Sequence, residues 1–159
     1  MSRLCVTTTD YLSAGTAVVT GFPVTLACWF RSSAATIDQE LVGINDTATD
    51  GQSNFLQAAG SVAGDPIRAG SRATSTVSAA TSTGYSTNPW HHACGVFTSA
   101  TSRTAYIDGG SAGTNTNNRT PAGINLTRIG TNFSAPAAAF FSGRIAEAAI
   151  WNVALTAAE

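Results

Sequence analysis

The chain has 159 residues, a formal net charge of −1 and only 11% charged residues, and arginine supplies all of its basic side chains. An ordinary soluble domain has about a quarter of its residues charged, so serine, threonine, asparagine and glycine must cover much of this surface. The arginines are scattered singly, which disfavours nucleic acid as a partner because a phosphate backbone selects clustered basic residues. No apolar run approaches the length of a membrane span, so we expect no membrane-crossing segment.

The length suits one domain with its own hydrophobic core, so residues 1–159 are predicted to form a single domain. A surface with so little charge lacks the repulsion that keeps copies apart, which predicts association, including a homo-oligomer. The first residues, Met1 to Val6, pass directly into strand-like sequence without the apolar core of a signal peptide. We therefore expect synthesis in a cytoplasm.

The three cysteines favour a reduced protein. Cys5, Cys28 and Cys94 are odd in number, and each lies within an apolar strand-like run. Such cysteines are usually buried and act as small apolar side chains. A disulfide between two of them remains the alternative.

Short strands separated by glycine and proline turns are predicted along the first half of the chain, over residues 4–9, 16–19, 24–31, 40–44, 54–58, 67–69 and 73–79. Residues 10–15 are expected to form a turn. Within the run 24–31, Leu26, Cys28 and Phe30 share one face, and apolar residues also occupy the other. This run is therefore predicted to be a central strand that is covered, at least in part, on both faces.

The second half predicts further strands over residues 90–98, 103–107, 124–130 and 140–151. Asp108-Gly109 is a two-residue hairpin signal, and residues 114–121 are expected to be a polar loop. In the last strand the apolar alternation shifts after Ile145, which indicates a bulge at Glu147. The final residues, 156–159, have the letters of a capping box and allow at most a residual helical turn.

Together these elements predict an all-β fold, a two-sheet antiparallel sandwich or jelly roll. The order of five motifs then carries a family resemblance: Phe22 to Phe30, Trp90-His91-His92, Tyr106 to Gly109, Phe141-x-Gly-x-Ile-x-Glu147, and Ile150 to Glu159. Over nearly the whole chain this order resembles the laminin-G-like, concanavalin A-like jelly-roll domains. The resemblance implies two curved antiparallel sheets.

The family includes lectins, pentraxins, adhesion modules, glucanases and virion surface proteins, so the fold alone does not select a function. The segments around Tyr11-Leu12-Ser13 and Phe22-Pro23 look most similar to stand-alone versions of the domain among bacteriophage structural proteins. The chain departs from the family pattern at Ala146, where the family usually has aspartate before the glutamate. Any polar contact made by that aspartate is therefore in question here.

Two motifs resemble catalytic or metal sites without the context that such sites need. Gly109 to Gly113 has the letters of a nucleophile elbow, but a hairpin precedes it and poor helix sequence follows it. His91 and His92 are adjacent on a strand and point to opposite faces, so they cannot hold one metal ion together without a bulge. We expect His92 to pack beside Trp90 inside the sandwich and His91 to form hydrogen bonds at a sheet surface.

A pair of carboxyl groups and a polar loop remain as weaker candidates. Asp38 and Glu40 can share a strand face, as the acids of glucanases do, but the third acid of that pattern is missing. No catalytic residue is therefore assigned, and the protein is expected not to be an enzyme. Asp46 and Asp50, with Asn45, offer oxygen ligands for calcium, although the EF-hand pattern fails and a solvated turn is favoured.

Trp29, Trp90 and Trp151 lie within apolar runs and are predicted to pack in the core; they would be able to stack on sugars only if exposed. The expected function is a non-catalytic virion structural protein, made in the host cytoplasm, that decorates a capsid by binding other coat proteins. The alternative is an extracellular carbohydrate-binding, lectin-like recognition or adhesion module. No binding residue is assigned for either function.

Overall fold

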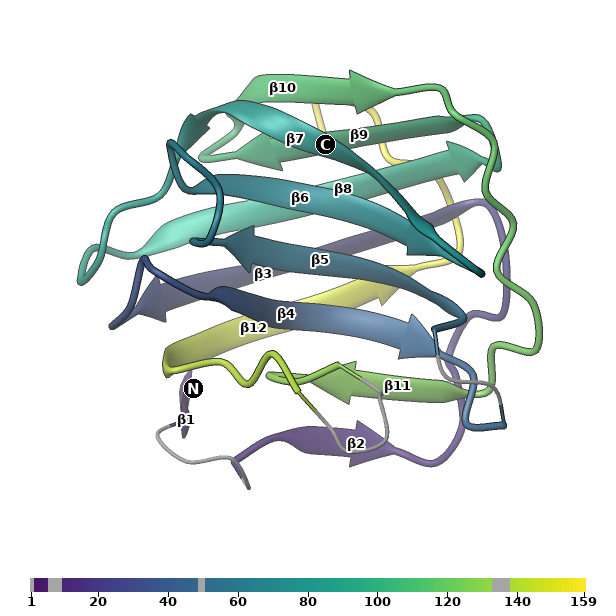
Figure 1. The fold of residues 1–159 in the computed structure, drawn as a ribbon, viewed down its shortest axis with the longest axis horizontal. Helices are drawn as coiled ribbons and strands as arrows, with labels where there is room; N and C mark the ends of the chain where they lie inside the picture. Colours follow the sequence, from purple (N-terminus) through teal and green to yellow (C-terminus); the bar gives the residue numbers. More distant parts are fainter. Residues whose placement is uncertain (1, 6–9, 49–50, 133–137) are drawn as a thin grey trace.

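A computed structural model describes residues 2–5, 10–48, 51–132 and 138–159 of the chain, which form two antiparallel sheets of six strands packed face to face (Figure 1). Sheet A has the strand order β1-β12-β3-β8-β9-β10, and sheet B has the order β2-β11-β4-β5-β6-β7. The strands are β1 Ser2–Cys5, β2 Leu12–Ala14, β3 Val24–Ser32, β4 Asp38–Asn45, β5 Ser53–Ala59, β6 Pro66–Arg72, β7 Thr76–Gly84, β8 His91–Ser99, β9 Ser102–Ile107, β10 Gly110–Asn115, β11 Leu126–Ile129 and β12 Gly143–Trp151.

The predicted all-β jelly-roll sandwich is thus confirmed. Within the described ranges every regular element is a strand, so they contain no helix long and apolar enough to cross a membrane. Each sheet brings together strands from distant parts of the sequence: β3 lies between β12 and β8, and β4 lies between β11 and β5. The prediction that residues 24–31 form a central strand is also confirmed.

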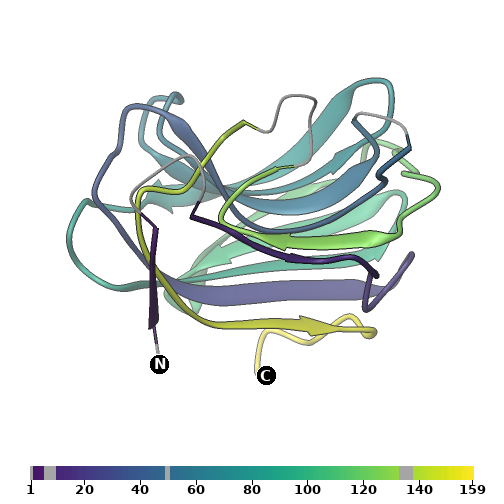
Figure 2. The same cartoon turned by 90° about the horizontal axis from the view of Figure 1, so that it is seen from below.

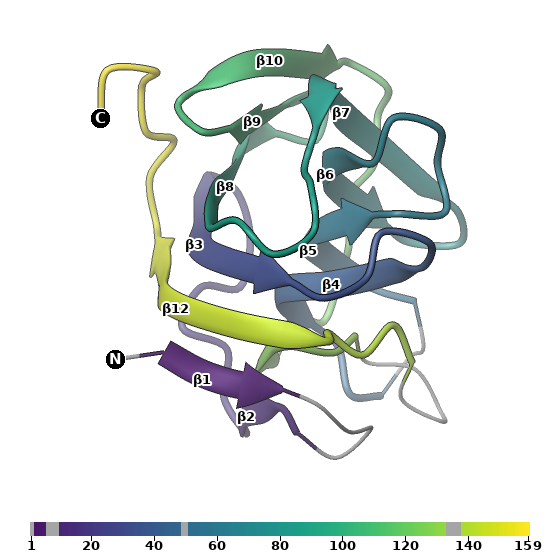
Figure 3. The same ribbon diagram turned by 90° about the vertical axis from the view of Figure 1, so that its left-hand side faces the viewer.

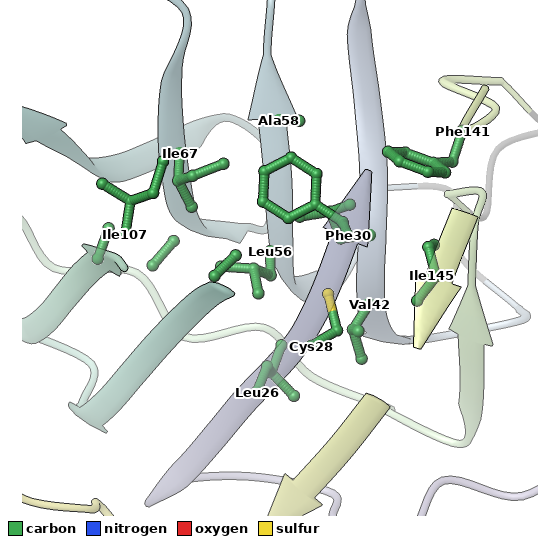
Figure 4. Packing of buried hydrophobic residues seen from close by; sticks show 14 of the residues in the cluster. Leu26, Cys28, Phe30, Val42, Leu56, Ala58, Ile67, Ile107, Phe141 and Ile145 are labelled. Carbon is green, nitrogen blue, oxygen red and sulfur yellow. The ribbon is translucent and has the colours of Figure 1, made fainter. Parts of the chain in front are cut away.

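The hydrophobic core lies between the two sheets and follows the alternation of each strand. Leu26, Cys28 and Phe30 of β3 point inward, and the close-up shows them facing Val42 and Leu56 of sheet B (Figure 4). The Phe30 ring makes edge-on contacts with Tyr85, at 5.6 Å between centroids, and with Phe141, at 6.3 Å. Complete burial of a side chain of this size contributes about 1.5–3 kcal/mol to folding. A register slip by one residue would move Leu26, Cys28 and Phe30 to the outer face, so their burial fixes the register of β3.

The C-terminal residues after β12 lie on the side of sheet A that faces away from sheet B, as the views from below and from the side show (Figures 2 and 3). Thr25 holds this segment in place: its hydroxyl donates to the Val153 carbonyl at 2.7 Å and accepts from the Leu155 amide at 3.1 Å. The chain ends in a turn in which the Thr156 amide and hydroxyl both donate to the Glu159 carboxylate at 2.9 Å. The Glu159 carboxylate thus reaches back to the Thr156 amide as in a capping box, but the second bond of the box is missing, because the Glu159 amide donates to the Thr156 carbonyl and not to its hydroxyl.

The prediction for residues 10–19 was wrong. The segment predicted to be a turn, residues 10–15, contains strand β2, which pairs with residues 127–129 of β11. The segment predicted to be a strand, residues 16–19, lies outside any strand. Val18 and Val19 have high β propensity, but this segment is attached to β11 by a side chain: the Val18 amide donates to the Thr127 hydroxyl at 3.4 Å. Pairing with a neighbouring strand therefore outweighed local propensity.

Strand β10 was not predicted, because glycine, serine, threonine and asparagine dominate it. It pairs with β9 through the predicted Asp108-Gly109 hairpin, in which both residues have the positive φ of a two-residue turn, 51° and 73°. The polar loop expected over residues 114–121 therefore begins only after Asn115. Buried Arg103 secures its start by donating to Asn115 Oδ1 at 2.6 Å and to the Asn117 carbonyl at 2.9 Å.

Two further predictions are confirmed. The register between β12 and β3 shifts between Ala146 and Ala149, and Glu147 in between has a φ of 51°, so the bulge exists. The three cysteines are free thiols, with Cys5 and Cys28 buried and Cys94 half-buried. Burial raises the pKa of the Cys94 thiol to about 11, which keeps it protonated at neutral pH.

Candidate functional site

The outer face of sheet A carries three exposed tryptophans, which corrects the prediction that they pack in the core. Trp29 and Trp90 are each 41% exposed and Trp151 is 38% exposed. Trp29 lies on β3 between the buried Cys28 and Phe30, so its ring must point to the opposite face. That face lies away from sheet B, and the side chain therefore meets solvent.

Trp29 and Trp90 line a shallow hollow of about 270 Å³ together with Ala146 and Glu147. Ala146 pairs with Trp29 across β12 and β3, and its small side chain leaves the indole accessible. The bulge that follows places the exposed Glu147 side chain in the same hollow. Two indoles and one carboxylate therefore share a single open surface.

A second hollow of about 320 Å³ lies further along the same face. It is lined by His92, Tyr106 and Trp151, by smaller side chains of β3 and β8, and by residues 155–159 of the C-terminal segment. The Trp29 and His92 rings touch, with 5.3 Å between centroids, and connect the two hollows. We refer to Trp29, Trp90, Trp151, His92 and Tyr106 as the tryptophan face.

The histidines divide between the two faces of β8, as the strand alternation predicted. His92 packs on Trp29 at the outer surface, so the expectation that it lies beside Trp90 inside the sandwich was wrong. His91 forms the expected hydrogen bonds: Nδ1 lies 2.8 Å from Asp108 Oδ2, and Nε2 accepts from the Ser86 amide at 3.2 Å. Because that amide can only donate, Nδ1 carries the proton of the neutral ring and donates to Asp108.

The glycine-serine motif does not form a nucleophile elbow. Ser111 lies in β10, directly after the hairpin, and its hydroxyl accepts a hydrogen bond from the Thr83 hydroxyl at 2.6 Å. A nucleophile elbow requires a strand followed by a helix, whereas here the serine belongs to a strand pair. The motif match is therefore accidental.

Asp38 and Glu40 both line one cavity on the outer face of sheet B. Asp38 Oδ1 accepts from the Ser61 hydroxyl at 2.6 Å and from the Ser61 amide at 3.2 Å. Glu40 is 4% exposed, and burial raises the pKa of its carboxyl to about 8 despite the opposing effect of Arg128 and Arg72. The pair thus consists of one hydrogen-bonded carboxylate and one carboxyl group that is protonated at neutral pH.

The calcium candidates do not converge in the described part of the loop. Asp46 is buried and its Oδ1 accepts from the Ala48 amide at 2.9 Å, which closes a local turn. Asn45 lines the cavity on sheet B, and Asp50 lies outside the described residues. In the part of the chain that the structure describes, no group of three or more histidine, cysteine, aspartate or glutamate side chains is placed to hold a metal ion.

Comparison with solved structures supports the fold. A heptameric SAP-like pentraxin from Limulus polyphemus superposes with a TM-score of 0.77 at 15% identity, over 98% of this chain and 77% of that chain. Domain 4 of the extracellular arabinanase AbnA from Geobacillus stearothermophilus, in complex with arabinotriose, gives 0.74 at 15% identity, over 93% and 69%. The CBM40 of a Ruminococcus gnavus IT-sialidase, bound to α2,3-sialyllactose, gives 0.73 at 9% identity, over 92% and 95%.

Among curated proteins, no sequence matches this chain. The family comparison is decisive, because a laminin-G model described as the concanavalin A-like lectin/glucanases superfamily matches residues 6–159. The match spans both sheets and agrees with the sandwich seen here. The chain therefore belongs to the laminin-G-like branch of the concanavalin A-like lectin/glucanases superfamily.

Proposed function

We propose that this domain is a non-catalytic carbohydrate-binding module and that the tryptophan face is its sugar-binding surface. The exposure of Trp29 and Trp90 beside the Glu147 carboxylate carries the proposal. The C–H face of a sugar ring packs against indole, and a carboxylate accepts hydrogen bonds from sugar hydroxyls. Both kinds of group meet in one hollow here.

The size and openness of the surface favour an extended glycan. The hollows of about 270 and 320 Å³ lie at or below the lower end of the range for small-molecule sites, roughly 300–1,000 Å³. Each therefore suits one or two sugar rings, and the Trp29–His92 contact connects them along the face. Two of the similar structures were solved with oligosaccharides, arabinotriose and sialyllactose, which supports this class of ligand without identifying the sugar.

A glycan screen followed by calorimetry on the best ligand tests the proposal. Trp29→Ala and Trp90→Ala should each weaken binding at least about tenfold, because each removes a stacking surface at the centre of the site. Ile37→Ala is the matched control, since Ile37 is 50% exposed but does not line either hollow. Absence of saturable binding across a broad screen would contradict the proposal.

A second candidate function is attachment to a larger particle, as in a capsid decoration protein made in the host cytoplasm. Its support is the combination of an exposed apolar face with only 11% charged residues, which favours protein–protein association. The partner would be a coat protein or a second copy of the domain. The tryptophan face would then be an interface rather than a sugar platform.

The mass of the native protein and its co-sedimentation with purified phage shells distinguish the two candidates. Particle attachment predicts sedimentation with the shells, or a homo-oligomer, that Trp29→Ala disrupts. A strictly monomeric protein that stays in the supernatant would count against this candidate.

A further inference from the structure

A second cavity, on the opposite side of the molecule from the tryptophan face, has the features of a ligand site. It lies on the outer face of sheet B, has a volume of about 230 Å³, and is lined by Asp38, Glu40, Asn45, Phe55, Arg68 and Arg72, among others. These side chains come from β4, β5 and β6, three adjacent strands in the middle and towards one edge of the sheet. We call this the Glu40 cavity.

Two glycines make room for the side chains that surround the cavity. A Cβ atom at Gly43 would collide with Glu40 Oε1 and would lie 3.2 Å from Asn45 Nδ2. A Cβ atom at Gly70 would collide with the Phe55 ring, which lies across that position. The carboxyl group, the amide and the ring can therefore lie close to the sheet surface only because these two positions lack side chains.

Several polar atoms in the cavity have no hydrogen-bond partner among the described residues. Glu40 Oε1 and Asn45 Nδ2 are buried and unpartnered, and the two residues are only 4% and 2% exposed. Arg68 Nε is also unpartnered, as are three other arginine Nε atoms in the described structure. Buried polar groups are nearly always satisfied in folded proteins, and repeated exceptions in one place need an explanation. A bound polar molecule would supply the missing partners.

Positive charges outnumber ionised carboxylates around the cavity. Arg68 and Arg72 bring two positive charges, and Arg128 on β11 acts on Glu40 from the other side. Burial keeps the Glu40 carboxyl protonated at neutral pH, with a pKa of about 8, so it too can donate. The acidic side chain of Asp38 is already engaged by Ser61. This balance favours a ligand with a negatively charged acceptor group.

The Phe55 ring adds an apolar wall, and only 7% of this residue is exposed. A simple inorganic anion would gain nothing from such a wall, whereas the C–H face of a sugar ring packs well against it. We propose that the Glu40 cavity is a second ligand site, which binds a carboxylate-bearing sugar with its carboxylate at Arg68 and Arg72 and its ring against Phe55. This site goes beyond the tryptophan face and does not depend on it.

Calorimetric titration with D-glucuronate, D-glucose and sodium sulfate at pH 7 and constant ionic strength tests the proposal. D-Glucuronate should bind at least tenfold more tightly than either of the other two probes. Equal binding of D-glucose, equal binding of sulfate, or no binding of D-glucuronate would each overturn it. Repeating the titration in the Trp29→Ala background, which removes the tryptophan-face site, measures the Glu40 cavity by itself. D-Glucuronate should still bind there and still be selected over D-glucose and sulfate, whether or not the tryptophan face binds a glycan.

Substitutions of the two arginines test whether D-glucuronate binds in the Glu40 cavity. Arg68→Gln should weaken D-glucuronate binding at least tenfold, and Arg72→Gln provides a second, independent removal of charge if the first variant folds poorly. Arg144→Gln is the matched control, because Arg144 is an exposed arginine on sheet A. Equal losses in Arg144→Gln and Arg68→Gln would show that only net charge matters and would overturn the assignment.

The pH dependence provides a final check. The charged groups that face Glu40 are Asp38 on its own strand, Arg68 and Arg72 on β6, and Arg128 on β11. Raising the pH from 7 to 9 passes through the pKa of Glu40, about 8, and should reduce the affinity for D-glucuronate about tenfold as the donor proton is lost. Glu40→Gln should bind at pH 7 and lose this dependence. A wild-type affinity that stays constant over this range would contradict the role given to Glu40.

Discussion

Glu40 is the residue whose environment departs most from what its chemistry prefers. Its carboxyl group is buried on a sheet face, with one oxygen unpartnered in the described structure and arginines nearby. In the sequence, Glu40 stands out as an acidic residue directly before the apolar run Leu41-Val42-Gly43-Ile44. The prediction that Asp38 and Glu40 share one face of the strand was correct, because both line the same cavity. The burial was not predictable, because it depends on the neighbouring strands β5 and β6 and on the space left at Gly43.

Replacing Glu40 with glutamine should raise the free energy of unfolding above that of the wild type at pH 7–8 and leave it nearly unchanged at pH 4. The pKa of Glu40 rises from 4.5 to about 8 on folding, so the folded state retains the proton longer, and stability falls as the pH rises from 4.5 to 8. Glutamine has no proton to lose. Urea unfolding at a series of pH values should show a gain on the order of 3 kcal/mol at pH 7, which lies 2.5 pH units above the unfolded pKa of 4.5.

The exposed acid Glu147 provides the control for this measurement. Glu147→Gln should show no comparable gain, because its side chain lies at the surface. A Glu40→Gln gain that is the same at pH 4 and pH 8 would contradict the proposed protonation of the buried carboxyl.

At the scale of single elements, the β9–β10 hairpin shows which local sequence signals were sufficient to predict the structure. The Asp108-Gly109 pair predicted the turn because few other residues accept positive φ at both positions. The strand that follows, β10, could not be predicted from the sequence because its residues have low β propensity. It forms because the turn places it beside β9. Turn chemistry was therefore a better guide here than strand propensity.

Asp108→Ala should destabilise the protein by about 1–3 kcal/mol in urea unfolding. The substitution removes the acceptors for His91 Nδ1 and for the His92 amide, both at 2.8 Å, and places alanine at a φ of 51°. Asp108→Asn keeps an acceptor oxygen and tolerates positive φ, so it should lose clearly less stability. Equal losses for the two variants would show that neither the backbone conformation nor the retained hydrogen bond matters.

At the scale of the whole molecule, strand alternation predicted which residues share a face but not which face is covered. Leu26, Cys28 and Phe30 were correctly placed together, and they form the core of the sandwich. Trp29 was misassigned because apolar residues occupy both faces of β3, and only the position of sheet B decides which of them is buried. A tryptophan left exposed carries no local sequence signal, so the proposed sugar-binding face became visible only with the three-dimensional structure.

The laminin-G resemblance, by contrast, was correctly recognised from scattered motifs, because those motifs mark neighbouring strands at the centre of sheet A. Trp29 lies on β3, His91 and His92 on β8, and Glu147 on β12, three adjacent strands of sheet A. The bacteriophage context is not a property that these positions encode. It remains a proposal that the shell-binding experiment tests.

The most direct test of the central claim is an NMR titration that follows the indole N–H signals of the three tryptophans while the best glycan from the screen is added. Glycan binding at the tryptophan face predicts that the Trp29 and Trp90 signals shift and saturate together, while the Phe55 amide on the far side of the molecule stays unchanged. Saturable binding of the glycan without any shift of the indole signals would contradict the account.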